Sequence, residues 1–328
     1  MTETVIEKLQ FSLSSEMTDV DLLMRERMKS EKVDLIEKVA GHLINAGGKR
    51  LRPLLTIASA KLFNYQGIKH IKLAAVVEFI HNATLLHDDV VDKSDRRRDK
   101  RTANVLWDNK SSILVGDFLF SRAFKLMIET NSPKILSILA NSSALISEGE
   151  VLQLSIAKNL NTPLETYYDV IRGKTAALFS ASCQTGSYVA GATKKQTNLL
   201  YNYGDALGIC FQIIDDLLDY RGAGDSLGKN IGNDFKERKV TLPLILAFKD
   251  ASNQEKKFWE RTIEKGVQND RDFHLALEIL KGKDILEKTY NIALKWSEMA
   301  KESLVGIPDS QTKDLMNDLC SYVVSRIS

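Results

Sequence analysis

The chain has 328 residues, a formal net charge of +2 and 27% charged residues. So small a net charge argues against a nucleic-acid-binding protein with a broad basic face, and any anion binding is therefore expected to be local. The length could hold two average domains, yet no Pro-, Gly- or Ser-rich linker and no shift in composition divides the sequence. We therefore expect a single domain over residues 1–328.

The cysteines and the N-terminal residues indicate the cellular compartment. Cys183, Cys210 and Cys320 are odd in number, far apart and surrounded by apolar helical sequence, which is typical of reduced core residues. The N-terminus lacks the basic and apolar segments of a signal peptide, and no stretch reaches about 18 uncharged apolar residues. We expect a soluble, cytoplasmic protein, with peripheral membrane contact if its product is a lipid.

Hydrophobic residues recur with the helical period in nearly every segment and almost never alternate with period two. Five prolines punctuate the pattern. Ser132-Pro133 is expected to begin a helix, and Thr193 with Gln196 has the spacing of a capping box. The sequence predicts an all-α fold, a single-domain bundle of about a dozen helices around a central cavity.

The most informative stretch is 76–98, VVEFIHNATLLHDDVVDKSDRRR, an apolar helix that ends in three aspartates and three arginines. At 3.6 residues per turn, His81, Asp88 and Asp92 share one stripe, whereas Asp89 is rotated away by about 100°. Like charges four residues apart repel, so the two carboxylates need a compensating cation. Hard oxygen ligands suit Mg²⁺.

A second apolar run ends in the same pattern at residues 208–219, GICFQIIDDLLD. Gly208, Gln212, Asp215 and Asp219 share a face of this helix. For a single copy, a solvated helix end is as good an interpretation as a metal site, because short motifs match by chance. Two copies, each on a helix too apolar to lie on a surface, favour carboxylates that line a cavity and hold a cluster of Mg²⁺ ions together with phosphate oxygens.

Several basic segments could bind the phosphates. In residues 45–53, NAGGKRLRP, two glycines end a helix and let the backbone approach a ligand, and three cations follow. The alternative, a helix end decorated with basic residues, is common. Gly173-Lys174-Thr175 lies at a helix junction but is too short for a Walker A loop. The long polar segment 221–239 carries Lys229 and Lys239, which could close over a diphosphate, although solvated loop lysines are commoner.

Taken together, these blocks resemble the trans-isoprenyl diphosphate synthases, and in particular their long-chain polyprenyl branch. The matching blocks, in chain order, are GGKRLRP, HNATLLHDDVVD followed by RR, ISEGEVLQL, GKT, FQIIDDLLD, GKN and DFKERKVTLPLI. They span residues 45–245. Two paired aspartate motifs in register with the other blocks make the resemblance specific.

The resemblance implies ionisation of an allylic diphosphate, attack by the double bond of isopentenyl diphosphate, and proton elimination. Three residues would hold three Mg²⁺ ions: Asp88, Asp92 and Asp215. Those that would grip the allylic phosphates are Arg97, Lys174 and Lys239, with Lys229 closing over them. Those that match the isopentenyl diphosphate site are Lys49, Arg52, His81 and Arg98. Two oxygens that would face the carbocation belong to Thr175 and Gln212. The family is usually homodimeric, so a homodimer is expected.

Product length is expected to be controlled near the first aspartates. Ala83 and Thr84 lie about one turn before Asp88 and are both small, so nothing bulky would block a growing tail there. Leu139, about three turns before Glu150, is our candidate for the floor of the tail path, although it could equally be an ordinary core residue. We expect a product in the octaprenyl range that serves as a quinone side chain.

The sequence departs from the family pattern in one segment, and other functions are still possible. Relatives commonly have Gly-Lys-Pro where this chain has Asp99-Lys100-Arg101, which changes the loop but leaves Arg97 and Arg98 in place. A shorter-chain synthase, making farnesyl or geranylgeranyl diphosphate, and a non-catalytic subunit of a heteromeric synthase are the alternatives that we keep open. A terpene cyclase would normally replace the second aspartate motif, and a di-iron bundle would need Glu-x-x-His pairs.

Overall fold

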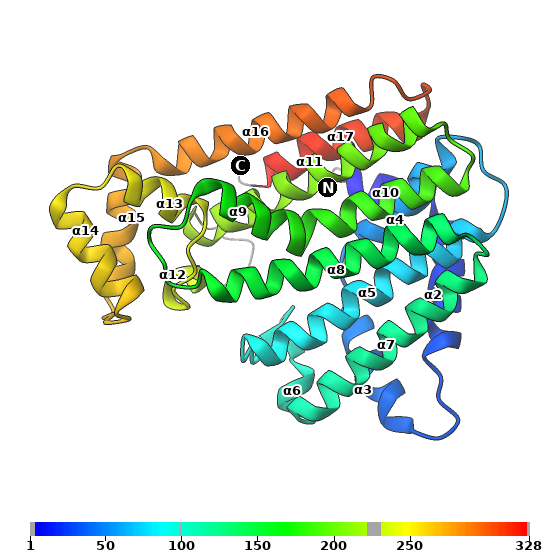
Figure 1. Cartoon of the computed structure of the whole chain (residues 1–328), viewed down its shortest axis with the longest axis horizontal. Helices are drawn as coiled ribbons and strands as arrows, with labels where there is room; N and C mark the ends of the chain where they lie inside the picture. The colour runs from blue at the N-terminus through cyan, green and yellow to red at the C-terminus, as the bar shows by residue number, and fades with distance from the viewer. Residues whose placement is uncertain (1–3, 99, 222–230, 327–328) are drawn as a thin grey trace. The chain divides into compact units, whose positions relative to one another are not determined.

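The computed structural model describes residues 4–98, 100–221 and 231–326, and nearly all of their regular structure is helical (Figure 1). The exception within these ranges is a short antiparallel ribbon of β1 (Arg96–Arg97) and β2 (Lys100–Arg101). The predicted all-α class is therefore confirmed. Separate helical segments exceed the expected dozen, because some, such as α6 (Ala103–Leu106) and α12 (Asn233–Lys236), are single turns.

The chain forms two compact units. Unit 1 comprises Met1–Ser143, Ala181–Tyr201 and Ile307–Leu315, and unit 2 comprises Ala144–Ser180, Asn202–Gly306 and Met316–Ser328. Four helices contribute residues to both units: α8 (Pro133–Ser155), α10 (Ala177–Val189), α11 (Lys194–Arg221) and α17 (Gln311–Ser325). Because four helices are shared, the boundary does not coincide with a linker. The single domain over 1–328 stays a prediction.

Unit 1 is organised around α5 (Lys69–Val91), which packs against α2 (Ser14–Met28), α4 (Leu51–Lys61) and α7 (Asn109–Glu129). Its other helices are α1 (Val5–Ser12), α3 (Asp34–Ile44) and α6. Residues on every side of α5 are buried, because its sequence is apolar around the whole circumference. The buried helix therefore fixes the positions of the polar residues at its C-terminal end.

Unit 2 contains the remaining helices, several of them short. They are α9 (Leu164–Ile171), the π-helical turn η1 (Arg172–Ala176), α12, α13 (Leu242–Lys249), α14 (Asn253–Trp259), the π-helical turn η2 (Glu260–Glu264), α15 (Asp272–Gly282) and α16 (Ile285–Ser303). An aromatic cluster joins α12 to α14 and α15, in which Phe235 contacts Phe258, Trp259 and Phe273. This cluster anchors the short segment that follows residue 230.

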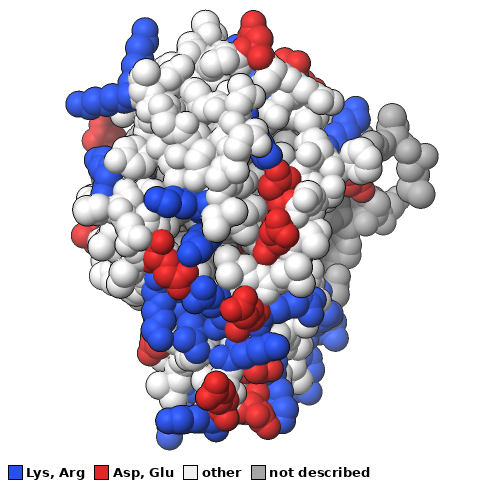
Figure 2. Space-filling model, turned by 90° about the vertical axis from the view of Figure 1, so that its right-hand side faces the viewer, with Lys and Arg blue, Asp and Glu red and all other residues white. Residues whose placement is uncertain are grey.

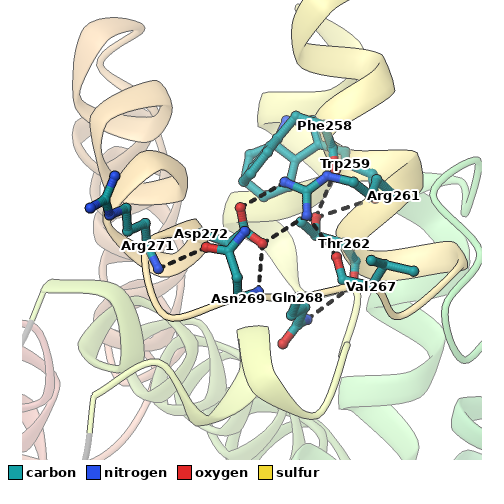
Figure 3. Close-up of polar contacts among 9 residues, drawn as sticks. All are labelled: Phe258, Trp259, Arg261, Thr262, Val267, Gln268, Asn269, Arg271 and Asp272. Atoms are coloured by element: carbon teal, nitrogen blue, oxygen red, sulfur yellow. Dashed lines mark hydrogen bonds and ion pairs between the residues drawn. The ribbon is translucent and has the colours of Figure 1, made fainter.

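A polar network closes the loop between η2 and α15 over the same cluster (Figure 3). The Arg261 guanidinium donates to both carboxylate oxygens of Asp272, at 2.8 and 2.6 Å, and to the carbonyl of Val267 at 2.8 Å. Gln268 Nε2 donates to the carbonyls of Thr262 and Phe235. A bidentate ion pair of this kind holds the guanidinium and carboxylate planes in one orientation. The loop is therefore held in place where Gln268 contacts α12.

Two predicted helix starts are confirmed. The Ser132 hydroxyl accepts from the Ile135 backbone amide at 3.3 Å as α8 begins at Pro133. Thr193 and Gln196 form the reciprocal box before α11, because the Gln196 amide donates to Thr193 Oγ1 and the Thr193 amide donates to Gln196 Oε1.

Two surface properties bear on partners. On the face shown in Figure 2, Lys and Arg side chains are interspersed with Asp and Glu, as expected from the small net charge. Among the described residues, α8 is the one helix long and apolar enough to cross a membrane. Length and composition are weak grounds for a span, since core helices of soluble proteins share them.

Candidate active site

The first acidic motif lies at the C-terminal end of α5. Asp88 is half-buried, and Asp92 is the exposed C-cap residue, whose amide donates to the Asp88 carbonyl at 2.8 Å. The negative end of a helix dipole disfavours carboxylates, and the last turn of α5 contains no basic residue. This pair of carboxylates is therefore suited to an external cation.

Asp89 has a different task from its neighbours, as its rotation around the helix suggested. Its side chain is 1% exposed, and Arg97 donates to Asp89 Oδ1 through Nε at 2.9 Å and through Nη2 at 2.8 Å. Burial raises the pKa of Asp89, and the Arg97 hydrogen bonds oppose this shift. Asp89 thus holds Arg97 in place, a role that the helical spacing alone did not reveal.

The segment that departs from the family pattern forms the β1–β2 hairpin. Arg96 pairs with Arg101, and Arg97 pairs with Lys100. Arg98 takes a left-handed turn conformation, with φ 52°, and Lys100 Nζ donates to the Asn45 carbonyl at 3.1 Å. Asp99 lies outside the described residues. With Asp99-Lys100-Arg101 in place of Gly-Lys-Pro, β1 still pairs with β2 and Arg97 still contacts Asp89.

His81, on α5, lies close to several guanidinium groups. Arg52 Nη1 lies 3.2 Å from His81 Nε2. Burial, followed by the positive charges of Arg52, Arg98, Arg97 and Arg50, lowers the pKa of His81 well below its usual value. The imidazole is therefore neutral and can accept from Arg52 while the guanidinium groups retain capacity for an anion.

The glycine loop adjoins this cluster. Gly47 and Gly48 have φ values of 85° and 139°, as expected for glycines that end a helix, and α3 stops at Ile44. The φ of Gly48 favours glycine, and a Cβ there would lie 2.5 Å from Arg98 Nη1, so the Arg98 guanidinium would have to shift. Lys49 is exposed beside it, and its carbonyl accepts from Gln10 Nε2. Unit 1 therefore brings together Lys49, Arg52, His81, Arg97 and Arg98.

The three candidate chain-length residues also lie in unit 1. Ala83 is fully buried, and Thr84 is half-buried, with its hydroxyl donating to the His81 carbonyl at 2.8 Å. Leu139, in the part of α8 that belongs to unit 1, is fully buried. Burial is compatible with both roles considered for Leu139, so its place as a floor residue stays a prediction.

In unit 2, the turn η1 presents Lys174 to α8. Lys174 Nζ lies 2.9 Å from Glu150 Oε1 and 2.9 Å from Gln153 Oε1. The approach depends on glycine, because a Cβ at Gly149 would lie 2.8 Å from the Lys174 backbone nitrogen and one at Gly173 would lie 2.7 Å from the Leu145 carbonyl. Glu150 lies within the block ISEGEVLQL, but nothing in the spacing of that block identifies it as the partner of Lys174.

Asp215 and Asp219, in the second acidic motif, are held differently. Arg326 Nη2 donates to Asp215 Oδ1 at 2.8 Å, and the Arg326 guanidinium lies 4.7 Å from the centre of the Phe211 ring. The Asp219 carboxylate instead accepts from the backbone amides of Asn233 and Asp234 at the start of α12. Asp215 is therefore paired with a cationic side chain, whereas Asp219 binds the backbone at the start of α12.

Thr175 and Gln212, the predicted pair of oxygen donors, are in direct contact. Thr175 Oγ1 donates to Gln212 Oε1 at 2.7 Å, and Gln212 Nε2 donates to Asp216 Oδ1 at 2.8 Å. Tyr167 OH donates to Asp216 Oδ2 at 2.6 Å. Burial raises the pKa of Asp216 to about 7, against the opposing effect of these two hydrogen bonds. Sequence spacing could not show the contact with Tyr167, which is 49 residues away.

The last two predicted phosphate ligands follow the second motif. Lys229 lies outside the described residues. Lys239 Nζ lies 2.5 Å from Glu237 Oε2, and its backbone amide donates to the Asp234 carbonyl at 2.8 Å. Lys174 and Lys239 are thus each paired with a carboxylate, and an incoming phosphate would have to compete for them.

Comparison with known proteins identifies the family. The family model for polyprenyl synthetase matches residues 33–280. Octaprenyl diphosphate synthase of Escherichia coli is 39% identical over 98% of this chain and 99% of that protein. A decaprenyl diphosphate synthase structure from Rhodobacter capsulatus is 52% identical, with a TM-score of 0.96, over 98% of this chain and 99% of that one.

A second solved structure extends the likeness. Polyprenyl synthase from Caulobacter crescentus, complexed with calcium and isoprenyl diphosphate, is 44% identical over the whole of both chains, with a TM-score of 0.94. The matches cover nearly all of the chain, the fold and both acidic motifs, and the chain therefore belongs to the polyprenyl synthetase family of prenyltransferases.

Proposed function

We propose that this prenyltransferase is a long-chain trans-polyprenyl diphosphate synthase that adds isopentenyl diphosphate repeatedly, head to tail, to an allylic diphosphate. The observation that carries the proposal is the environment of α5. One buried helix bears a neutral His81 among guanidinium groups and, two turns later, a pair of carboxylates at its C-terminal end. The similarity to octaprenyl and decaprenyl synthases supports a long-chain product.

We infer that Mg²⁺ is the cofactor, three ions per active site, held by Asp88, Asp92 and Asp215. The donor set fits, because these are hard carboxylate oxygens, two of them at the C-terminal end of α5, and Asp215 already binds a cationic group, Arg326. One or two carboxylates are the usual protein share of a Mg²⁺ site that substrate phosphates complete. When bound, the metal neutralises charge on the departing diphosphate.

The remaining residues bind and orient the substrates. Arg97, held by Asp89, and the lysines Lys174 and Lys239 present cations to the allylic phosphates. Lys49, Arg52 and Arg98 bind isopentenyl diphosphate, and His81 orients Arg52 by accepting its hydrogen bond. Preorganised charges of this kind stabilise the transition state without rearranging. Thr175 and Gln212 turn oxygen atoms toward the developing carbocation, and the departed diphosphate removes the proton.

The decisive test is turnover by the isolated chain. The protein is incubated with Mg²⁺, isopentenyl diphosphate and either farnesyl or geranylgeranyl diphosphate, and the extracted products are sized by chromatography. A series of products extending to the octaprenyl range supports the proposal. Absence of turnover that returns only when a second subunit is added would instead identify a subunit of a heteromeric synthase.

The two diphosphate sites should be separable by kinetics. Replacing Lys49, Arg52 or Arg98 with Ala should raise the KM for isopentenyl diphosphate far more than that for the allylic primer, since each charge-assisted contact contributes about 1.5 to 3 kcal/mol. Arg96→Ala is the matched control, because Arg96 is an exposed neighbour in the same hairpin. Equal effects on both KM values would contradict the division into two sites.

Arg326 should compete with the metal for Asp215. Their ion pair is partly buried, with side-chain exposures of 15% and 31%, and it occupies Oδ1, one of the two oxygens that Asp215 could offer to Mg²⁺. Arg326→Met should therefore tighten Mg²⁺ binding several-fold, as expected when a partly screened ion pair worth about 1 kcal/mol is removed. Calorimetric titration measures this, with the exposed Arg221→Met as control. Unchanged or weaker binding would show that Arg326 does not oppose the metal.

We also propose a homodimer in the cytoplasm that makes a quinone side chain and contacts membranes peripherally to release it. In support of the dimer, α7 carries exposed apolar residues at helical spacing, among them Leu114, Phe124 and Ile128, which are 66%, 43% and 64% exposed. Exposed apolar faces of this kind commonly form subunit interfaces. Light scattering should give twice the chain mass, and charged substitutions at Leu114 and Ile128 should halve it.

A further inference from the structure

We propose that Tyr167 is a positioning residue for the carbocation, acting through Asp216 to fix the orientation of the Gln212 amide. The proposal rests on the function proposed above and extends it to a residue that touches neither metal nor substrate. Four side chains carry it, all in unit 2: Tyr167 on α9, Thr175 on η1, and Gln212 and Asp216 on α11.

The direction of each hydrogen bond follows from chemistry. An ionised carboxylate only accepts hydrogen bonds, so both neighbours of Asp216 must donate to it. Tyr167 OH donates to Oδ2 at 2.6 Å and Gln212 Nε2 donates to Oδ1 at 2.8 Å. Burial, and then the charge of Asp216, raises the pKa of Tyr167 well above its usual value, so the phenol remains a donor. Gln212 is therefore bound through its nitrogen.

This orientation decides what the amide presents to Thr175. Because Nε2 donates to Asp216, Oε1 faces Thr175 and accepts a hydrogen bond from the Thr175 hydroxyl, with 2.7 Å between the two oxygens. Because the Thr175 hydroxyl already donates its hydrogen to Gln212, its oxygen can only accept further hydrogen bonds. Both groups accordingly offer oxygen lone pairs, the arrangement that stabilises a nearby positive charge. An inverted amide would turn N–H groups toward the same place and oppose that charge.

Tyr167 restricts the alternatives open to Asp216. Tyr167, Asp216 and Thr175 are 3%, 4% and 6% exposed, so water has little access to replace a missing donor. Without the phenol, either carboxylate oxygen could serve Gln212, and the carboxylate could rotate away from its present position. A buried network that is fully satisfied specifies one arrangement, whereas a partly satisfied one does not. The phenol thus fixes the carboxylate, and the carboxylate fixes the amide.

The test is a double-mutant cycle on the full-length enzyme. Tyr167→Phe should lower kcat about tenfold with both KM values within about twofold, because the loss appears only in the transition state. In the Gln212→Met background, which has no amide to orient, Tyr167→Phe should cause no further loss. Tyr168→Phe is the matched control, since this neighbouring ring makes tilted contacts with Tyr167 and with Trp296, and it should leave kcat unchanged.

A rescue experiment separates positioning from folding. Incorporating 3-fluorotyrosine at position 167 keeps the volume and the hydroxyl donor, and should restore kcat to within about twofold of the parent even if Tyr167→Phe lowers the unfolding temperature. Additive losses in the cycle, or a loss confined to KM, would overturn the role of Tyr167. If the parent enzyme itself shows no turnover, the proposed function fails instead, so the two failures are distinguishable.

Discussion

Replacing Asp88 or Asp92 with Ala should lower turnover by about three orders of magnitude, the scale of loss when a group that stabilises leaving-group charge is removed. Asp215→Ala should have a similar effect. Asp88 and Asp92 lie at the end of α5, whose dipole already opposes carboxylates, and each substitution would remove one proposed hard oxygen ligand. Expression and helicity should barely change, since Asp92 is exposed and Asp88 half-buried. Steady-state rates measured over a range of Mg²⁺ concentrations check this.

Two further aspartates serve as comparisons. Asp95→Ala is the control, because Asp95 has an exposed side chain and lies four residues after Val91, the last residue of α5. Asp89→Ala should be milder than Asp88→Ala but not silent, because it releases Arg97 rather than a metal ligand. Near-parental turnover by Asp88→Ala at saturating Mg²⁺ would show that the first motif does not hold the metal.

The helical period predicted much of what positions these residues. His81, Asp88 and Asp92 lie on a single buried helix, as their spacing required, and Asp89 points elsewhere because it is rotated about 100° from them. The capping box at Thr193 and the glycine stop before Lys49 follow from local chemistry in the same way. Such features are encoded within a few residues, so the sequence alone is enough to find them.

The partners of the charged residues could not be found in that way. Arg326 with Asp215, and Tyr167 with Asp216, are separated by 111 and 49 residues, and no periodicity links positions so far apart. Asp219 shares the motif spacing of Asp215, yet it accepts backbone amides from α12. The partner of each aspartate is determined by how elements far apart in the sequence pack together. The spacing within the motif does not reveal which carboxylate contacts which partner.

Product length should respond to the size of residue 83. An extended five-carbon unit is about as long as one helical turn, roughly 5.4 Å, so a tail of seven or eight units needs an unblocked path of roughly 38 Å between helices. Ala83 lies on α5 five residues before Asp88 and adds only a methyl group. Ala83→Phe should therefore shorten the product to farnesyl or geranylgeranyl size, while ionisation of the allylic diphosphate continues. Chromatography of the extracted products measures this.

Ala83→Phe could also destabilise the protein by overpacking, so a second block at Thr84 tests the same path independently. Ala83 is fully buried, so a phenyl ring there can cost about 1 to 3 kcal/mol of stability by overpacking. Thr84→Phe places a similar block at a half-buried position and should also shorten the product. Ala83→Ser, which hardly changes the volume, is the control and should keep the parental length. The same chain length from Ala83→Phe, Thr84→Phe and the parent would show that the tail does not pass these residues.

Leu139 should act in the opposite direction if it closes the far end of the path. Leu139→Ala removes three carbon atoms from a fully buried position and should lengthen the product by one or more five-carbon units. The same substitution at an ordinary core position would cost about 2 to 5 kcal/mol and leave the product unchanged. Unfolding temperature and product length, measured on the same variant, therefore distinguish the floor residue from a core residue. Ile135→Ala, one turn earlier on α8 and equally buried, is the matched control for lost stability.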